Sequence, residues 1–268
     1  MPGWQQFLDI AVEAARIAGK FQLRRFASIL NVTLKGDKNL VTEVDRESER
    51  LIVGHLLGSF PDHNIVAEEG EYPQGDSPFR WIIDPLDGTT NYTHGFPWFC
   101  VSIGLISAGE VGAGVIYNPM HDELFTATKG GGAFLNGHRL SVSTRSPLHN
   151  TLLGTGFPYD CASDPANNFD NFIAFQKAAR GIRRAGAAAL DLAYVAAGRL
   201  DGFWELKLKP WDVAAGVLMV REAGGTVTTF DGTDYDIFNH RIVASNGLIH
   251  EEMVAMLTRL DQGEFHET

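Results

Sequence analysis

Two aspartates three residues apart, Asp84 and Asp87, carry the strongest chemical signal in this chain of 268 residues. The apolar residues 81–83 precede them and indicate a buried strand that ends in acid. Burying one carboxylate is costly, and burying two close together costs more unless a cation neutralises them. Mg²⁺ is the simplest candidate, because it prefers carboxylate and carbonyl oxygens and leaves positions open for water and substrate phosphate.

Gly88 and Thr89 follow the second aspartate directly. A glycine and a threonine in this position can open a helix, and the free N–H groups of a helix start bind phosphate. One short segment therefore offers both a metal site and a phosphate site.

Four further acids have a functional and a plainer interpretation. Glu68 and Glu69 follow the apolar residues 64–67; alone they indicate a solvated loop, but beside the aspartate pair they predict a second strand end that completes a metal shell. Asp212 precedes an alanine-rich helix, where an N-cap and a metal ligand are both possible. For Asp45, in the first turn of a predicted helix, a favourable charge–dipole interaction is the preferred interpretation, with orientation of a water molecule as the alternative.

Composition limits the classes of function. The net charge of −11 disfavours direct nucleic-acid binding, which needs a basic face. Cys100 lies in an apolar run and Cys161 in a polar loop, a usage that indicates a reducing cytosol rather than a disulfide framework. No signal peptide is evident in the first residues of the sequence, and no apolar run is long enough to span a bilayer. We therefore expect a cytoplasmic protein without a membrane or nucleic-acid partner.

Helical spacing and turn signals predict two helices followed by short strands and hairpins in the first half. Helices are expected over residues 4 to about 29 and 43–57, the second capped by Thr42, with a turn-rich loop at 35–39. Short strands and hairpins follow, at residues 64–67, 80–83, 98–106, 111–117 and 123–128.

The second half alternates strands with helices, which is typical of an α/β arrangement. Strands are expected at residues 152–154, 203–206, 226–228 and 242–244, and helices at 169–179, 187–197, 213–223 and 251–260. No linker or repeat separates residues 1–145 from 146–268, so we expect one continuous domain over residues 1–268.

Other common active-site patterns are missing from the sequence. The nine histidines show no zinc spacing, and there is no Gly-x-Ser-x-Gly elbow. The glycines 130–132 lack the Lys-Ser/Thr of a phosphate-binding P-loop and predict a hairpin turn instead. Arg183 and Arg184, before the small residues 186–189, fit either two solvated cations at a helix start or a loop that faces substrate.

Taken together, residues 67–69, 84–91 and 211–216 resemble the motifs of the inositol monophosphatase family, in the family order. The resemblance runs from residues 40–42 through 222–225, and residues 184–191 and 196–202 are most similar to the bacterial SuhB-type branch. It implies the α/β, αβαβα sandwich of the inositol monophosphatases and fructose bisphosphatases, usually dimeric.

The resemblance also implies the metal ligands. Glu68, Asp84 and the Leu86 carbonyl would hold one Mg²⁺. Asp84, Asp87 and Asp212 would hold a second. Glu68, with Glu69, would contact a weaker third ion.

Further residues would act on water and substrate. Thr89, with Asp45 behind it and Glu68 at the first metal, would orient and deprotonate the attacking water. The Gly88 and Thr89 N–H groups would hold phosphate oxygens. The substrate pocket would use the side chains and backbone of Asp87, Asp212, Gly186, Ala188 and Glu205.

The implied activity is Mg²⁺-dependent hydrolysis of myo-inositol 1-phosphate, with fructose 1,6-bisphosphate and 3′-phosphoadenosine nucleotides as alternative substrates in the same superfamily. Glu205 favours a polyol, because a carboxylate accepts hydrogen bonds from neighbouring hydroxyls. Relatives of the SuhB type also suggest a different role, as a protein partner in bacterial transcription complexes, with Arg183 and Arg184 as candidate contacts.

Overall fold

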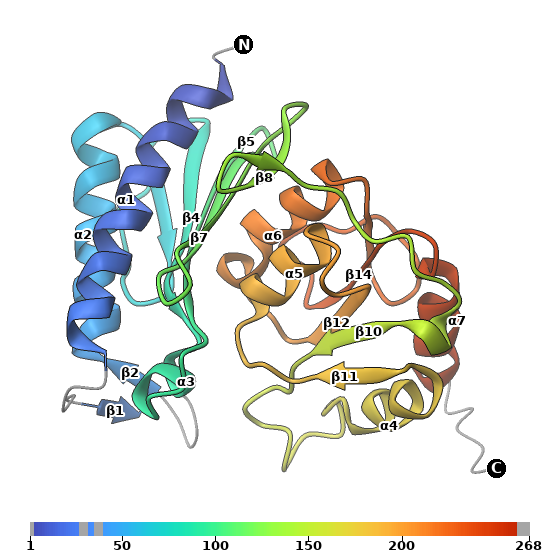
Figure 1. Cartoon of the computed structure of the whole chain (residues 1–268). Coiled ribbons are helices and arrows are strands. Elements are labelled where there is room, and N and C mark those ends of the chain that lie inside the picture. The colour runs from blue at the N-terminus through green and yellow to red at the C-terminus, as the bar shows by residue number, and fades with distance from the viewer. Residues whose placement is uncertain (1–2, 27–31, 35–39, 262–268) are drawn as a thin grey trace.

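Helices and sheets stack in five alternating layers in the computed structural model, which describes residues 3–26, 32–34 and 40–261 (Figure 1). Helices α1 (Trp4–Arg25) and α2 (Glu43–Ser59) cover one sheet. The middle layer is α5 (Ala188–Ala196) and α6 (Pro210–Glu222). A second sheet follows, and α4 (Phe169–Ala178) and α7 (His250–Asp261) cover its far face. This order confirms the predicted αβαβα sandwich.

The first sheet has seven strands within the described residues, in the order β3-β4-β5-β6-β7-β8-β9. Strands β3 and β4 are parallel, and the later neighbours pair antiparallel. Their bounds are β3 Asn64–Ala67, β4 Phe79–Asp87, β5 Cys100–Ser107, β6 Glu110–Asn118, β7 Glu123–Thr128, β8 Gly132–Leu135 and β9 His138–Arg139. The short helix α3 (Thr89–Thr93) follows β4. Strand β1 (Val32–Leu34) pairs with β2 (Leu40–Thr42).

The second sheet has the order β11-β10-β12-β14-β13 and mixes parallel with antiparallel pairs. Its elements are η1 Leu148–Asn150, β10 Leu152–Thr155, β11 Gly181–Arg183, β12 Gly202–Leu206, β13 Thr226–Thr228 and β14 Arg241–Ser245. The alternation of strands and helices confirms the α/β pattern expected of this half.

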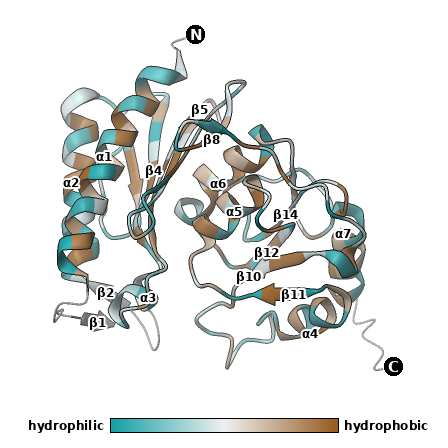
Figure 2. Ribbon diagram, in the orientation of Figure 1, coloured by the Kyte–Doolittle hydropathy of each residue, from teal (hydrophilic) through white to brown (hydrophobic). Residues whose placement is uncertain are grey.

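Local sequence explains where the first two helices begin and end. Helix α1 ends at Arg25, before the predicted end near residue 29; residues 27–31 and the predicted loop 35–39 lie outside the described residues. Thr42 caps α2, as predicted, because its Oγ accepts from the Val44 and Asp45 N–H groups. In Figure 2 hydrophobic and hydrophilic residues alternate along both helices, as expected of helices with one face on a sheet.

Strand ends differ from prediction mainly at β4. The sequence predicts a strand over residues 80–83, but β4 continues through Pro85 to Asp87. The glycines 130–132 turn between β7 and β8, as predicted, with Gly130 and Gly132 at positive φ.

The central hydrophobic cluster takes residues from both halves of the chain, including Ile82 and Ile116 of the first sheet and Leu192 of α5. Helix α6 lies directly on the first sheet, because the cross-strand partners Gly104 and Gly114 have no side chain to keep it away. The two halves therefore share one packed interior. Among the described residues no helix is both long and apolar enough to cross a membrane.

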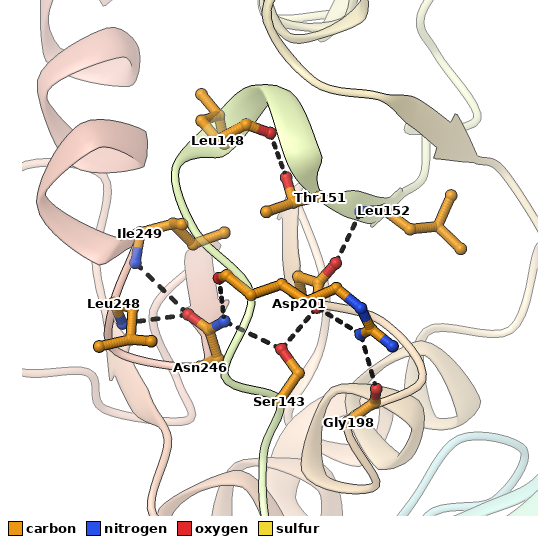
Figure 3. A network of polar contacts seen from close by, with 10 residues as sticks. Ser143, Leu148, Thr151, Leu152, Gly198, Asp201, Asn246, Leu248 and Ile249 are labelled. Atoms are coloured by element: carbon orange, nitrogen blue, oxygen red, sulfur yellow. Dashed lines mark hydrogen bonds and ion pairs between the residues drawn. The ribbon is translucent and has the colours of Figure 1, made fainter.

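A buried polar network attaches the segment between the two halves to the second sheet (Figure 3). Asp201 is fully buried and accepts from Ser143 Oγ at 2.5 Å, Arg145 Nη1 at 2.9 Å and the Leu152 N–H at 2.7 Å. Asn246 Nδ2 donates to Ser143 Oγ at 2.9 Å. Because each buried polar group has a partner, the network fixes how the chain enters the second half.

The close approach of α6 to the first sheet gives a test of the packing. A Cβ on Gly114 would lie 3.0 Å from Ala215 Cα, a backbone atom that cannot move alone. Gly114→Val is expected to lower the free energy of unfolding by about 1–3 kcal/mol through overpacking, measured by urea denaturation. Gly54→Ala, on an open position of α2, is the matched control and should raise it by about 0.5–1 kcal/mol. Equal effects of the two substitutions would contradict this packing.

Candidate active site

A cavity of about 440 Å³ opens where the end of β4 meets the second half of the chain. The predicted metal ligands line it, with Glu68, Asp84 and Asp87 from the first half and Asp212 from α6. Three further acids of the second half also line it, Asp160, Asp191 and Glu205. Residues of β10 and β12 and the start of α5 also line it. The acids that were separate signals in the sequence therefore share one cavity.

An irregularity in β4 presents the two aspartates. Asp84 pairs with Ser102 and Asp87 with Cys100, and the register shifts between them. Pro85 lies in this shift and has no N–H for a strand ladder, which explains why the regular pairing stops there. Asp84 is 2% exposed, and its Oδ1 accepts from the Leu86 N–H at 2.9 Å.

Glu68 reaches the same place because β3 runs parallel to β4. Ala67 pairs with Ile83, so Glu68 is the residue that follows the ladder beside Asp84. The Glu68 N–H donates to the Ile83 carbonyl at 3.2 Å. Two neighbouring parallel strands thus end in acid at one edge of the sheet.

The second half meets these acids at the first turns of two helices. Asp212 is the third residue of α6, and its Oδ2 accepts from the Lys209 N–H at 2.7 Å. The N-cap interpretation of Asp212 is therefore wrong, because Lys209 holds that position and Asp212 interacts with it from inside the helix. Asp87 Oδ2 accepts from the Ala189 N–H of α5 at 2.8 Å.

Thr89 connects the cavity to a buried acid behind it. Thr89 Oγ donates to Asp45 Oδ1 at 2.8 Å and lies 3.1 Å from the Leu86 carbonyl oxygen. Asp45 is 1% exposed, and its Oδ2 accepts from the Thr42 N–H at 2.8 Å. Asp45 therefore stabilises the start of α2 and also contacts Thr89, so the plainer and the functional interpretation are compatible.

The residues that the resemblance assigns to the polyol lie in the same cavity. Gly186, Ala188 and Glu205 all line the cavity. Asn91 Nδ2 donates to the Ala185 carbonyl at 2.9 Å and to the Trp98 carbonyl at 2.8 Å, which holds the loop before Ala188 against the first half. Glu69 does not line the cavity; its N–H donates to Glu49 Oε2 at 2.8 Å.

Negative charge accumulates in this cavity. Burial raises the pKa of Asp84, and the charges of Glu68, Asp87 and Asp212 raise it further. Burial likewise raises the pKa of Asp212, and raises the pKa of Asp87 to about 7, although the Ala189 N–H opposes that shift. The pKa of Glu205 is also raised, chiefly by burial. Such a group of acids favours a bound cation.

The donor atoms suit a hard divalent cation, since they are carboxylate and carbonyl oxygens only. Across residues 3–26, 32–34 and 40–261, no three His, Cys, Asp or Glu side chains are already gathered closely enough to hold an ion. Like charges repel at short range, and a cation would draw them together. The donor chemistry therefore fits Mg²⁺.

Several residues of the cavity carry no clear signal in the sequence. Arg184 lines it, which selects the substrate-facing interpretation for this residue, whereas Arg183 is exposed on β11. Tyr159 lies on a loop of the second half that borders the cavity. Lys207 Nζ donates to both Asp160 carboxylate oxygens at 2.8 Å and so holds that loop to the end of β12. These contacts join distant segments, which no local pattern reveals.

Comparison with known proteins agrees with this geometry. The model of the inositol monophosphatase family matches residues 3–262. The chain belongs to the inositol monophosphatase family. An inositol-1-monophosphatase of Synechocystis sp. is 45% identical over 260 residues, covering 96% of this chain and 91% of the relative. The Nus factor SuhB of Escherichia coli is 46% identical over 253 residues, covering 92% and 94%.

Solved structures with a similar sequence identity to this chain share its fold. The extragenic suppressor protein suhB from Bartonella henselae is 45% identical with a TM-score of 0.90, covering 95% of this chain and 99% of that one. An inositol monophosphatase from Anabaena (Nostoc) sp. is 45% identical with a TM-score of 0.87, covering 95% and 96%. The predictions of the family and of a metal-dependent phosphatase are confirmed. The roles of single residues remain predictions.

The Lys207 contacts give a prediction about the loop that borders the cavity. Besides Asp160, Lys207 Nζ pairs with Asp164 at 2.9 Å. Lys207→Met is expected to speed amide hydrogen exchange over residues 158–164, with little change in Tm because these groups are partly exposed. Lys129→Met, which breaks the Lys129–Glu110 ion pair elsewhere on the surface, is the control. Unchanged exchange in residues 158–164 would show that the ion pairs do not hold the loop.

Proposed function

We propose that this protein hydrolyses the phosphate monoester of a polyol, with myo-inositol 1-phosphate as the principal substrate, to the free polyol and phosphate. The observation that carries the proposal is one cavity lined both by the acids Glu68, Asp84, Asp87 and Asp212 and by Glu205. The acids suit a cation and a phosphate group, and Glu205 suits hydroxyl groups. Relatives at 45% identity over most of the chain are named inositol-1-monophosphatases.

Two or three Mg²⁺ are proposed for the acidic part of the cavity. Glu68, Asp84 and the Leu86 carbonyl would hold the first, and Asp84, Asp87 and Asp212 the second. Glu68 would contact a third, without Glu69, which lies outside the cavity. When bound, the ions would supply charge neutralisation of the phosphoryl group and a more acidic water. Phosphoryl transfer depends mainly on such positioning and charge stabilisation, so a site without a nucleophilic side chain is sufficient.

The remaining residues would position water and substrate. The Thr89 hydroxyl would accept a proton from the attacking water while it donates its own to Asp45, the bond that it already makes at 2.8 Å. Gly88 has φ of +96°, and a Cβ there would lie 2.9 Å from the Trp98 carbonyl oxygen, so the turn requires glycine. The Gly88 and Thr89 N–H groups would hold phosphate oxygens. Gly186 and Ala188 would leave room for the polyol, and Glu205 would accept its hydrogen bonds.

A panel of phosphate esters tests which alcohol is the preferred leaving group. We expect kcat/KM to be higher for myo-inositol 1-phosphate than for fructose 1,6-bisphosphate, histidinol phosphate or adenosine 3′,5′-bisphosphate. Glu205→Gln should lower kcat/KM for the inositol ester more than for p-nitrophenyl phosphate, whose leaving group lacks vicinal hydroxyls. A wild-type preference for either bisphosphate would instead support the alternative activities of the superfamily.

Asp87→Asn directly tests the proposed metal site. The amide keeps an oxygen that can accept from the Ala189 N–H, so the fold should remain. It removes a negative charge, so Mg²⁺-dependent turnover should fall to background in a phosphate-release assay. Asp76→Asn, at an exposed acid outside the cavity, should leave turnover unchanged. Turnover close to normal in Asp87→Asn would refute the assigned site.

The same carboxylate predicts how stability depends on pH. The pKa of Asp87 is about 7 in the folded protein and about 3.9 in an unfolded chain, so the folded state binds the proton more tightly. In a chelator, Tm should therefore rise as pH falls through about 7, and Mg²⁺ should raise Tm most above that pH. Asp87→Asn should flatten the pH dependence. A chelator profile identical in wild type and Asp87→Asn would contradict this electrostatic account.

A role in transcription complexes is the second candidate, favoured by the name Nus factor SuhB of relatives at 46–47% identity. Arg183 and Arg184 are exposed on an otherwise acidic chain and offer candidate contacts. A pull-down with transcription elongation factors, using wild type and Arg183→Ala, tests this role. Cell function that is retained in Asp87→Asn but lost in Arg183→Ala would favour the partner role over the enzymatic one.

A cytoplasmic homodimer is proposed as the working form. Both cysteines are free, with Cys100 buried, which suits a reducing compartment. Phe169 and Ile173 of α4 are 45% and 44% exposed and would be covered in a dimer. Light scattering after size-exclusion chromatography, with Ile173→Glu as the interface variant, tests the dimer.

A further inference from the structure

Gln22 is a buried polar side chain directly behind the acidic segment of β4. It is 0% exposed on α1, a helix whose buried face is otherwise built from small and apolar residues. Its Nε2 donates to the Pro85 carbonyl oxygen at 2.7 Å and lies 3.3 Å from Ser48 Oγ. The contact with Pro85 joins residues 63 positions apart, so the tertiary fold creates it.

The Pro85 carbonyl is where β4 leaves regular pairing. Asp84 and Asp87 still pair with β5, and the register shifts between them. Asp84, Leu86 and Asp87 line the cavity, whereas Pro85 does not. A buried carbonyl at such an irregularity needs a donor, and Gln22 supplies one. The hydrogen bond thus holds the segment from the side away from the cavity.

Burying the side-chain amide of Gln22 is unfavourable unless its polar atoms are hydrogen-bonded. Its Oε1 has no hydrogen-bond partner among the described residues, although the atom is buried. An unsatisfied buried acceptor costs about 1–3 kcal/mol, and an apolar residue would avoid that cost. The hydrogen bond to the Pro85 carbonyl offsets part of this cost.

Gln22 also connects the elements around the site. Its backbone carbonyl accepts from Tyr92 Oη of α3 at 2.7 Å. Ser48 belongs to α2, the helix that begins beside Asp45. Helices α1, α2 and α3 therefore meet at this residue, immediately behind β4.

We propose that Gln22 is a positioning residue for the metal site: by holding the Pro85 carbonyl, it sets the spacing of the Asp84 carboxylate, the Leu86 carbonyl and the Asp87 carboxylate. This inference rests on the proposed binding of Mg²⁺ at those atoms and adds the residue that holds them in place. Gln22 touches neither the ion nor the substrate.

Gln22→Met tests the proposal, because methionine has nearly the same length and lacks the donor. We expect the dissociation constant for Mg²⁺, measured by calorimetry on the free protein, to rise about tenfold or more, as for other groups that orient metal ligands. The dissociation constant for Mn²⁺, measured by electron paramagnetic resonance, should rise to a similar extent. At saturating Mg²⁺, kcat should recover most of its value while the Mg²⁺ requirement stays raised.

Tyr92→Phe is the matched control. It removes a buried hydrogen bond to Gln22 but leaves the bond from Nε2 to Pro85. We expect it to lower Tm without changing the Mg²⁺ dissociation constant. If Gln22→Met does not fold, Gln22→Asn serves instead, because its amide is one methylene too short to reach Pro85 in the same way.

The outcomes separate this inference from the proposed function. A lower Tm with an unchanged Mg²⁺ dissociation constant in Gln22→Met would show that the residue is only structural and would overturn the proposal. Equal loss of Mg²⁺ affinity in Tyr92→Phe would also overturn it. A wild-type protein that binds no Mg²⁺ would refute the metal site itself.

Discussion

Burial of several carboxylates in one cavity, together with the repulsion among them, is the constraint on which the rest of this structure depends. Asp84, Asp87 and Asp212 each have a raised pKa, chiefly because of burial, and the charge on the other acids raises it further. Desolvation alone makes such a cluster unfavourable. A fold that assembles it gains a place where a divalent cation and a phosphate group are both stabilised.

The layered architecture assembles that cluster from segments that are far apart in sequence. Parallel pairing of β3 with β4 brings Glu68 beside Asp84, and the first turns of α5 and α6 bring the second half to the same edge. The Ala189 N–H that meets Asp87 compensates part of the negative charge. The acids are thus positioned by contacts between the halves, and the shared interior holds those contacts in place.

Periodicity and turn residues predicted most of the elements, whereas the layered arrangement was implied by the resemblance to the inositol monophosphatase family. The acids at strand ends were also predictable, because carboxylates directly after an apolar run are unusual. Other features depend on tertiary contacts. The extension of β4 through Pro85, the position of Asp212 inside α6 and the bond from Gln22 to Pro85 all require knowledge of which distant segments meet. Local patterns contain no such information.

The most direct test of the central claim is anomalous diffraction from crystals soaked in Mn²⁺ as a substitute for Mg²⁺. The account predicts at least two strong peaks, one shared by Glu68 and Asp84 and one shared by Asp84, Asp87 and Asp212, with Asp84 common to both. Peaks elsewhere on the surface, with none among these four acids, would contradict it.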